Sequence, residues 1–307
     1  MNLKRTLIFA HLALLAANII YGLNYNIAKI LMPDYISPLG LVALRAIVAT
    51  ILFWVFSVFF PREKVAPKDI LYLLMFFAFG VFFNQVFFLL GLNKTSPINA
   101  SLIMLINPVI AIILGAFILK ETLSARRIFG VIMGMAGTAF LILGRGEINI
   151  GEGSFMGDLL IFLTAASWAL FLVMIKKMTD KYKSYTVMKW VFLFGLFPNI
   201  TIGFNQLNDV DFFSLPSVII MALLYVTVFT TFIGYNLNMY GLGHLSPTVV
   251  STYVYIQPVI AVIVAIVLKQ DSLNIQKIIS ALLVFSGVYL VSVSPTRKNK
   301  PGLELGK

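Results

Sequence analysis

Two cationic side chains lie within apolar stretches of this chain. A charge in such a stretch costs free energy unless it binds a partner. Lys29 and Arg45 lie near the ends of two such stretches. Together they could bind the carboxylate or phosphate of a solute, because an ammonium and a guanidinium both donate hydrogen bonds to anionic oxygens. The alternative is that both side chains reach toward lipid headgroups and bind no solute.

Amide, hydroxyl and aromatic side chains share single faces of other apolar stretches. At 100° per residue, Asn18, Tyr21 and Tyr25 lie on the same helix face as Lys29. Polar groups inside a membrane helix cost free energy, so such faces should line an interior cavity. The alternative, above all for Ser and Thr, is that they join helices to one another. The candidate solute-binding residues are Asn18, Tyr21, Tyr25, Lys29, Arg45, Asn84, Gln85, Ser101, Trp168, Thr231, Asn238, Ser251 and Tyr255.

Motifs for catalysis or metal binding are missing from the sequence. The chain has no cysteine, which excludes a disulfide framework and a thiolate metal site. It has neither a GxxxxGK[ST] phosphate loop nor an HExxH motif. All 12 Asp and Glu fall in loops or near helix ends, which argues against a carboxylate proton relay. We expect no enzyme activity, no cofactor and no metal.

The composition indicates a membrane protein. Of 307 residues, 60% are apolar and 11% are charged, whereas a soluble domain carries about 25% charged residues. The net charge of +11 fits basic cytoplasmic loops better than a nucleic-acid partner. Ten apolar segments are long enough to span a bilayer as helices. They are 7–31, 39–60, 70–92, 97–119, 128–143, 157–175, 185–204, 215–241, 247–268 and 275–293.

One part of the sequence occurs twice. Residues 91–143 align with 241–293 without a gap, with 14 identities in 53 positions. The shared residues include Ser96-Pro97 with Ser246-Pro247, and Pro108 with Pro258. The chain therefore reads as two copies of one unit, at 1–144 and 157–294, followed by a basic cytoplasmic tail at 295–307. Pro108 and Pro258 would kink two equivalent helices and are candidate hinges.

The distribution of Lys and Arg predicts the topology. With the N-terminus inside, 17 Lys and Arg fall on the cytoplasmic side and 4 on the outer side. Five helices per unit then insert the second copy upside down relative to the first. The expected fold is an all-α membrane protein of ten transmembrane helices in two inverted five-helix repeats, an architecture typical of secondary transporters.

The pattern resembles the EamA family of the drug/metabolite transporter superfamily. The resemblance rests on Tyr21-Gly22-x-Asn24, Ser96-Pro97, Lys120-Glu121 and their second-copy counterparts, and covers nearly the whole chain. The chain departs from the family where Tyr21 replaces the usual Trp and Gln270 stands at the position of Lys120. The resemblance implies a ten-helix carrier that moves small metabolites or amino acids, often outward.

The expected function is therefore secondary active export of a small organic metabolite, such as an amino acid, by alternating access. A nucleotide-sugar or sugar-phosphate carrier, with Lys29 and Arg45 on the phosphate, is the alternative within transport. A membrane enzyme or assembly factor for envelope lipids is the alternative of another class. The expected setting is the plasma (inner) membrane, with both termini cytoplasmic. The expected partners are a small-molecule metabolite and the lipid bilayer, but no nucleic acid, and a homodimer stays open.

Overall fold

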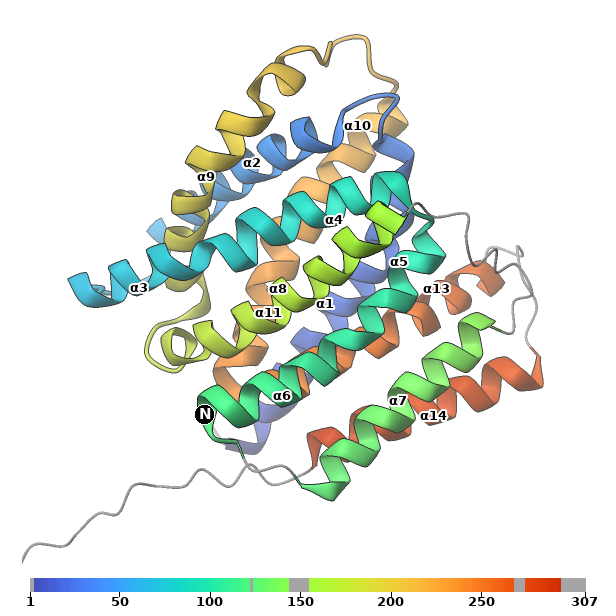
Figure 1. The fold of residues 1–307 in the computed structure, drawn as a ribbon. Coiled ribbons are helices and arrows are strands. Elements are labelled where there is room, and N and C mark those ends of the chain that lie inside the picture. Colours follow the sequence, from blue (N-terminus) through green and yellow to red (C-terminus); the bar gives the residue numbers. More distant parts are fainter. Residues whose placement is uncertain (1–2, 122–123, 144–154, 268–273, 294–307) are drawn as a thin grey trace, which may run out of the picture.

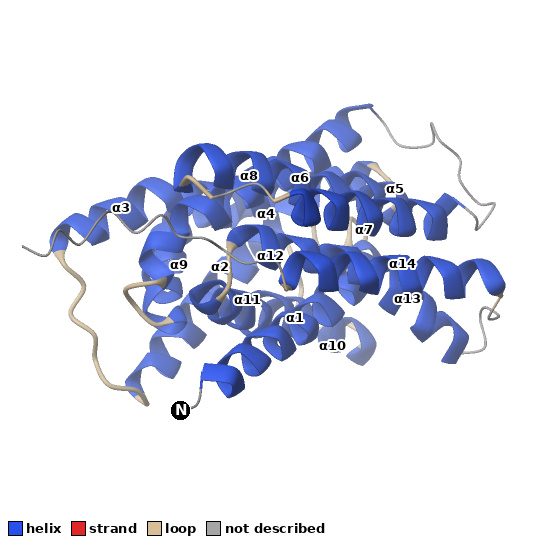
Figure 2. Ribbon diagram, turned by 90° about the horizontal axis from the view of Figure 1, so that it is seen from below, coloured by secondary structure: helices blue, strands red, loops and turns tan. Residues whose placement is uncertain are grey.

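The computed structural model describes residues 3–293 except for 122–123, 144–154 and 268–273, so the predicted tail at 295–307 lies outside the described residues. Within the described part the chain forms helices and no strands (Figures 1 and 2). In the first half these are α1 (Leu3–Leu31), α2 (Pro38–Val58), α3 (Pro67–Phe77), η1 (Ala78–Phe82), α4 (Phe83–Lys94), α5 (Pro97–Ile103), η2 (Met104–Ile106), α6 (Asn107–Leu119) and α7 (Ala125–Leu143). In the second half they are α8 (Phe155–Thr179), α9 (Ser184–Asn208), α10 (Ser217–Leu224), η3 (Tyr225–Ile233), α11 (Gly234–His244), α12 (Pro247–Thr252), η4 (Tyr253–Tyr255), α13 (Ile256–Val267) and α14 (Ile275–Ser292).

Eight helical segments in the described part are long and apolar enough to cross a membrane. Their outer surfaces carry large apolar side chains such as Phe117, Phe155 and Phe197, all of which are exposed. Water would not tolerate so many exposed large apolar groups, whereas acyl chains would. The eight segments are Lys4–Leu31, Pro38–Val58, Pro67–Lys94, Asn99–Leu119, Phe155–Thr179, Ser184–Asn208, Ser217–His244 and Ile275–Ser292.

Three Ser-Pro pairs begin helices. The Ser37 hydroxyl accepts a hydrogen bond from the Gly40 amide at the start of α2. Ser96 and Ser246 cap α5 and α12 in the same way. In each case the following proline occupies the first helical turn, where its missing N–H costs nothing. These caps fix where three helices begin.

Helix irregularities recur at matching places in the two halves. The π-helical segments η1 and η3 interrupt α3–α4 and α10–α11, and the 3-10 turns η2 and η4 interrupt α5–α6 and α12–α13. Pro108 is the second residue of α6, directly after η2, and Pro258 is the third residue of α13, directly after η4. The two prolines thus lie where each helix changes its hydrogen-bond pattern.

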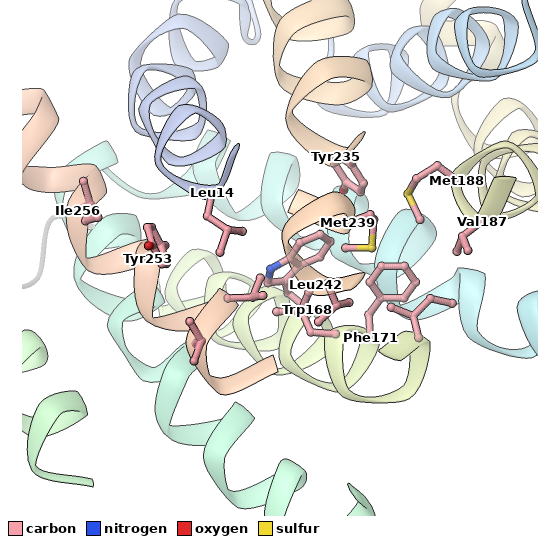
Figure 3. Close-up of a cluster of buried hydrophobic side chains, with 14 of the residues drawn as sticks. Leu14, Trp168, Phe171, Val187, Met188, Tyr235, Met239, Leu242, Tyr253 and Ile256 are labelled. Carbon is pink, nitrogen blue, oxygen red and sulfur yellow. The ribbon is translucent and has the colours of Figure 1, made fainter. Parts of the chain in front are cut away.

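The two halves are packed against each other along most of their length. α2 lies along α9, α7 along α14, α4 along α8, and α1 along α11 (Figure 1). The largest apolar cluster joins these elements through Leu14 of α1, Trp168 and Phe171 of α8, and Tyr235 and Met239 of α11 (Figure 3). The two halves therefore share this apolar cluster.

Glycines set the distance between α7 and α14. A Cβ on Gly287 would lie 2.6 Å from the Gly130 carbonyl oxygen and 2.6 Å from the Gly134 nitrogen, both of them backbone atoms. Backbone cannot move aside as a flexible side chain can. Small residues at such crossings let two helices approach closely.

We expect Gly287→Ala to lower the free energy of unfolding by about 1–3 kcal/mol, because α14 must move away from α7. Thermal unfolding of the purified protein in detergent measures the change. Gly115→Ala in α6 is the matched control, since a Cβ there meets its nearest atom, Cδ of Glu121, at an ordinary 3.5 Å. Equal melting temperatures for the two variants would contradict the close crossing.

Candidate functional site

A central cavity lies among helices of both halves. The space free of protein atoms there is about 640 Å³, a volume that includes the part open to solvent. Its lining from the first half comprises Asn18, Tyr21, Asn24, Tyr25, Arg45, Asn84, Phe88 and Met104. Its lining from the second half comprises Thr164, Trp168, Thr230, Tyr235, Asn238, Val250, Val254 and Gln257.

Seven of the 13 residues singled out in the sequence line this cavity. They are Asn18, Tyr21, Tyr25, Arg45, Asn84, Trp168 and Asn238. Six others lie outside the lining. The six are Lys29, Gln85, Ser101, Thr231, Ser251 and Tyr255.

The residues outside the lining have other contacts. Thr231 accepts a hydrogen bond from Arg45, and the Gln85 amide lies 3.5 Å from the Tyr235 hydroxyl. The Tyr255 hydroxyl donates to the Leu105 carbonyl at 3.3 Å. The Ser251 hydroxyl donates to the carbonyl of Thr248, one turn earlier in the chain, and Ser101 is half-buried in α5. Of these side chains, Gln85, Thr231 and Tyr255 contact residues of other helices.

Three aromatic rings form one side of the cavity. The Tyr235 ring lies edge-on to Trp168, with centroids 5.3 Å apart, and edge-on to Tyr21, with centroids 6.5 Å apart. Gly234 permits this, because a Cβ there would lie 2.8 Å from Cε1 of Tyr21. Edge-to-face pairs are favourable arrangements of aromatic rings. The three rings give the cavity a rigid apolar face.

Amide side chains make another part of the cavity wall polar. The Gln257 amide donates to Asn18 Oδ1 at 2.8 Å, which joins α13 to α1. The Asn84 amide donates to the Thr164 carbonyl at 3.2 Å, which joins α4 to α8. The Tyr235 hydroxyl lies 3.3 Å from Asn84 Oδ1. These contacts hold polar atoms of both halves at the cavity wall.

Several polar atoms of the lining have no hydrogen-bond partner within the described part of the chain. They are Tyr21 Oη, Asn24 Oδ1, Arg45 Nη1, Thr230 Oγ1 and Asn238 Oδ1. Buried polar groups are almost always hydrogen-bonded in folded proteins. Five such atoms therefore belong to residues around one cavity.

Arg45 is buried rather than extended toward a surface. Its residue is 3% exposed, and its Nε donates to the Thr231 hydroxyl oxygen across the two halves at 2.9 Å. The sequence left open whether Arg45 reaches lipid headgroups, and its burial beside the cavity excludes that arrangement in this structure.

Lys29 binds backbone rather than the cavity. Its Nζ donates to the carbonyls of Leu92, Asn93 and Thr95 at 2.8, 2.9 and 3.2 Å, at the C-terminal end of α4. Lys176 in the second half likewise donates to the carbonyl of Leu242 at the end of α11, at 2.5 Å. Cations are favoured at helix C-termini, where the last carbonyls lack partners. Each lysine ties the end of one helix to another.

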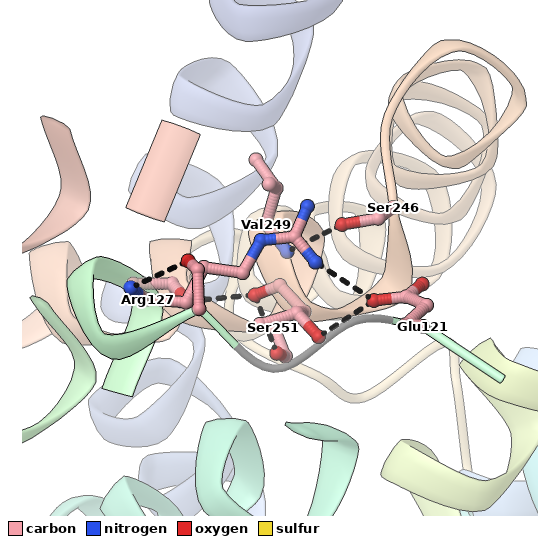
Figure 4. Close-up of polar contacts among 8 residues, drawn as sticks. Glu121, Arg127, Ser246, Val249 and Ser251 are labelled. Atoms are coloured by element: carbon pink, nitrogen blue, oxygen red, sulfur yellow. Dashed lines mark hydrogen bonds and ion pairs between the residues drawn. The ribbon is translucent and has the colours of Figure 1, made fainter. Parts of the chain in front are cut away.

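A buried ion pair lies at the end of the bundle where α6 and α8 finish. Arg127 Nη1 lies 3.2 Å from Glu121 Oε2, and the Thr248 hydroxyl donates to the same oxygen at 3.3 Å (Figure 4). Burial raises the pKa of the Glu121 carboxyl, although the nearby Arg127 charge acts in the opposite direction. The hydrogen bond from Thr248 joins the second half to Glu121 of the first half.

Nine lining residues are not among the 13 candidates, and two of these nine are Tyr235 and Gln257. Two signals could have identified them. Tyr235 shares a helix face with Thr231 and Asn238, and Gln257 precedes Pro258 just as Asn107 precedes Pro108 in the first copy. Comparing equivalent positions of the two copies would have found Gln257.

Comparison with known proteins identifies the family of the chain. It matches the EamA-like transporter family at residues 8–143 and again at 155–293. It is 25% identical to "Uncharacterized transporter YyaM" of Bacillus subtilis, over 92% of this chain and 93% of that protein. It is 26% identical to the "Probable amino-acid metabolite efflux pump" of Escherichia coli, over 91% of this chain and 93% of that one.

A solved crystal structure shares the fold. It superposes with a TM-score of 0.72 over 94% of this chain and 97% of the other, at 16% sequence identity. The family match covers both halves of the chain and most of its length. The chain is therefore a multi-pass membrane protein that belongs to the EamA-like transporter family.

Proposed function

We propose that this chain is a secondary active transporter that exports small organic metabolites, such as amino acids, by alternating access. The observation that carries the proposal is a polar, aromatic-lined cavity to which both halves contribute, with unpaired polar atoms around it. A solute there could be reached from either side if the halves rock against each other. The name of the Escherichia coli relative, an efflux pump for amino-acid metabolites, supports the substrate class and direction.

The proposed architecture is ten transmembrane helices in two inverted repeats, at 1–144 and 157–294. The two spans proposed in addition to the eight described above are α7 and the α12–α13 segment. The reciprocal packing supports this arrangement, because α2 with α9 and α7 with α14 join equivalent members of the two copies. The Lys and Arg distribution supports placing both termini in the cytoplasm and the protein in the plasma (inner) membrane.

Equivalent side-chain contacts in the two halves also support a pseudo-two-fold axis. Lys29 donates to the carbonyl of Leu92, and Lys176 donates to that of the equivalent Leu242. The second pair of contacts involves the residues before the two prolines. The Asn107 amide donates to the carbonyl of Ala165, while the Gln257 amide donates to the side chain of Asn18. Each contact thus has a counterpart made by the corresponding helices.

The proposed hinges are the 3-10 turns η2 and η4 together with Pro108 and Pro258. Met104 of η2 and Val254 of η4 both line the cavity, so a change in either turn would change the cavity wall. Proline at these positions removes a backbone hydrogen bond and lowers the cost of bending there.

A phosphate-bearing solute is less well supported. That alternative required Lys29 and Arg45 to act on the same phosphate. The Lys29 ammonium is instead bound by three backbone carbonyls at the end of α4, while Arg45 lies at the cavity. The geometry therefore favours a solute with a single anionic group.

Transport in proteoliposomes tests the proposed function. We expect the purified protein to move at least one of the 20 labelled amino acids across the membrane faster than empty liposomes allow. Asn238→Leu should reduce that flux about tenfold, because it removes a polar atom of the cavity wall and fills space.

Asn205→Leu is the matched control, because Asn205 is exposed on α9, away from the cavity lining. Its flux should stay within about twofold of the unmodified protein. No flux for any amino acid, together with no thermal stabilisation by a wider panel of metabolites, would contradict the transporter proposal.

A further inference from the structure

We propose that Arg45 binds the anionic group of the transported solute, and that the substrates are small carboxylates that also carry N–H donors. This inference rests on the proposed function and assigns a role within the same cavity.

Arg45 is a buried cation without an ion-pair partner among the described residues. The ion pairs found there involve Arg127, Lys176 and Lys181 instead. A guanidinium that is 3% exposed loses most of its hydration, and one hydrogen bond from Nε to a neutral threonine hydroxyl does not replace it. An anionic solute would supply the missing compensation when it binds.

Arg45 lines the cavity, and one nitrogen of its guanidinium has no partner in the described part of the chain. Nε is held by Thr231 across the two halves, and this contact fixes the orientation of the planar guanidinium. Nη1 is buried and has no hydrogen-bond partner in the described part of the chain, and Arg45 is part of the cavity lining. A fixed guanidinium with a free N–H is suited to a carboxylate oxygen.

The other lining residues favour an anion with attached donors. Neither Asp nor Glu is among the cavity-lining residues in the described structure, so no protein carboxylate competes for Arg45. Asn24 Oδ1 and Asn238 Oδ1 are buried acceptors without partners there, and they suit an ammonium or amide N–H of the solute. The face formed by Tyr21, Trp168 and Tyr235 would pack against an apolar side group.

Cysteine labelling tests the charge selectivity without knowledge of the substrate. The native chain has no cysteine, so Asn84→Cys would place a single thiol in the cavity lining. Its thiolate attacks a methanethiosulfonate, which forms a mixed disulfide and releases methanesulfinate. The rates are compared for an anionic sulfonatoethyl reagent, a cationic trimethylammonioethyl reagent and the neutral methyl reagent.

We expect the anionic-to-cationic rate ratio to fall about tenfold when Arg45→Gln is added. Arg62→Gln is the control, because Arg62 is exposed in the loop before α3 and its loss changes the net charge equally. It should leave the ratio unchanged. An unchanged ratio in Arg45→Gln, with the neutral reagent still reacting, would overturn the role of Arg45 and leave the transporter proposal standing. No reaction with any of the three reagents would instead contradict a solute cavity at this place.

Thermal stabilisation tests the substrate class. Each amino acid that stabilises the unmodified protein is compared with its methyl ester, which keeps the amine and side chain but lacks the carboxylate. We expect the ester to bind at least about tenfold more weakly, and this difference to vanish in Arg45→Gln but not in Arg62→Gln. Equal binding of acid and ester to the unmodified protein would overturn the inference, even if the protein transports both.

Discussion

Replacement of Arg127 by methionine is expected to lower the free energy of unfolding by about 3–5 kcal/mol, because it leaves a buried carboxylate without its counter-ion. The Arg127 side chain is 1% exposed and that of Glu121 is 9% exposed, so solvent screens the pair weakly. Thermal unfolding of the purified protein in detergent measures the loss. Arg126→Met is the matched control, because this neighbouring arginine is exposed.

A second substitution separates the lost ion pair from lost packing. Adding Glu121→Gln to Arg127→Met removes the uncompensated charge and should restore more than half of the stability. The remaining amide can still accept a hydrogen bond from the Thr248 hydroxyl, as the carboxylate does. If the double variant is as unstable as Arg127→Met alone, the loss comes from packing and the ion pair contributes little.

The same site predicts a dependence on pH. Burial raises the pKa of Glu121 in the folded protein above its ordinary value, and Arg127 opposes this shift. The folded state therefore binds the proton more strongly than the unfolded state, so this group's contribution to stability falls as pH rises through the two pKa values. Without Arg127 the folded pKa rises further. Arg127→Met should therefore be more destabilised at pH 8 than at about pH 5, and an equal loss at both would contradict the role of the Glu121 charge.

The repeat in the sequence predicted more of the fold than any single motif did. The Ser-Pro pairs mark the starts of α2, α5 and α12, and the two matched prolines mark where the helices change to 3-10 turns. Both follow from local backbone chemistry, which is legible in sequence. The π-helical segments η1 and η3 were not predicted, because an extra residue in a helical turn leaves no composition signal.

Helical periodicity gave the direction of a side chain but not its depth in the bundle. Thr231 and Asn238 share a face of η3–α11, yet only Asn238 lines the cavity, while the Thr231 hydroxyl accepts a hydrogen bond from Arg45. Tyr235 was missed for a related reason. A tyrosine counts as an apolar residue in a hydropathy pattern. The Tyr235 hydroxyl nevertheless lies within hydrogen-bond distance of the Gly80 carbonyl and the Asn84 side chain, which belong to another helix. Contacts between helices far apart in sequence decide such cases.

For the charged residue Lys29, too, helical periodicity did not predict the partners of the side chain. Periodicity placed its ammonium near one end of a helix that faces the cavity, and a solute or a lipid headgroup seemed the available partners. Its partners are backbone carbonyls of residues more than 60 positions away in the chain. A backbone carbonyl is the same for every residue type, so a sequence pattern does not reveal it. Helix C-terminal carbonyls are present in every helix, so the sequence does not indicate which end a lysine will reach.

Lys29→Met is expected to lower the free energy of unfolding by about 2–3 kcal/mol, because three carbonyls at the end of α4 lose a charged donor. The methionine keeps most of the apolar stem, so packing changes little. Lys94→Met is the matched control at the same end of α4, where the lysine is exposed. Thermal unfolding compares the two.

The measurement also separates the two roles considered for Lys29. If the ammonium supports the helix end, Lys29→Met lowers the melting temperature, and adding solute raises it by the same increment as in the unmodified protein. If the ammonium binds solute instead, the melting temperature without solute changes little, and the increment on adding solute is lost. The three short contacts to backbone favour the first outcome. The second would return Lys29 to the solute site beside Arg45 and would make a doubly charged anionic group, such as a phosphate, the better substrate.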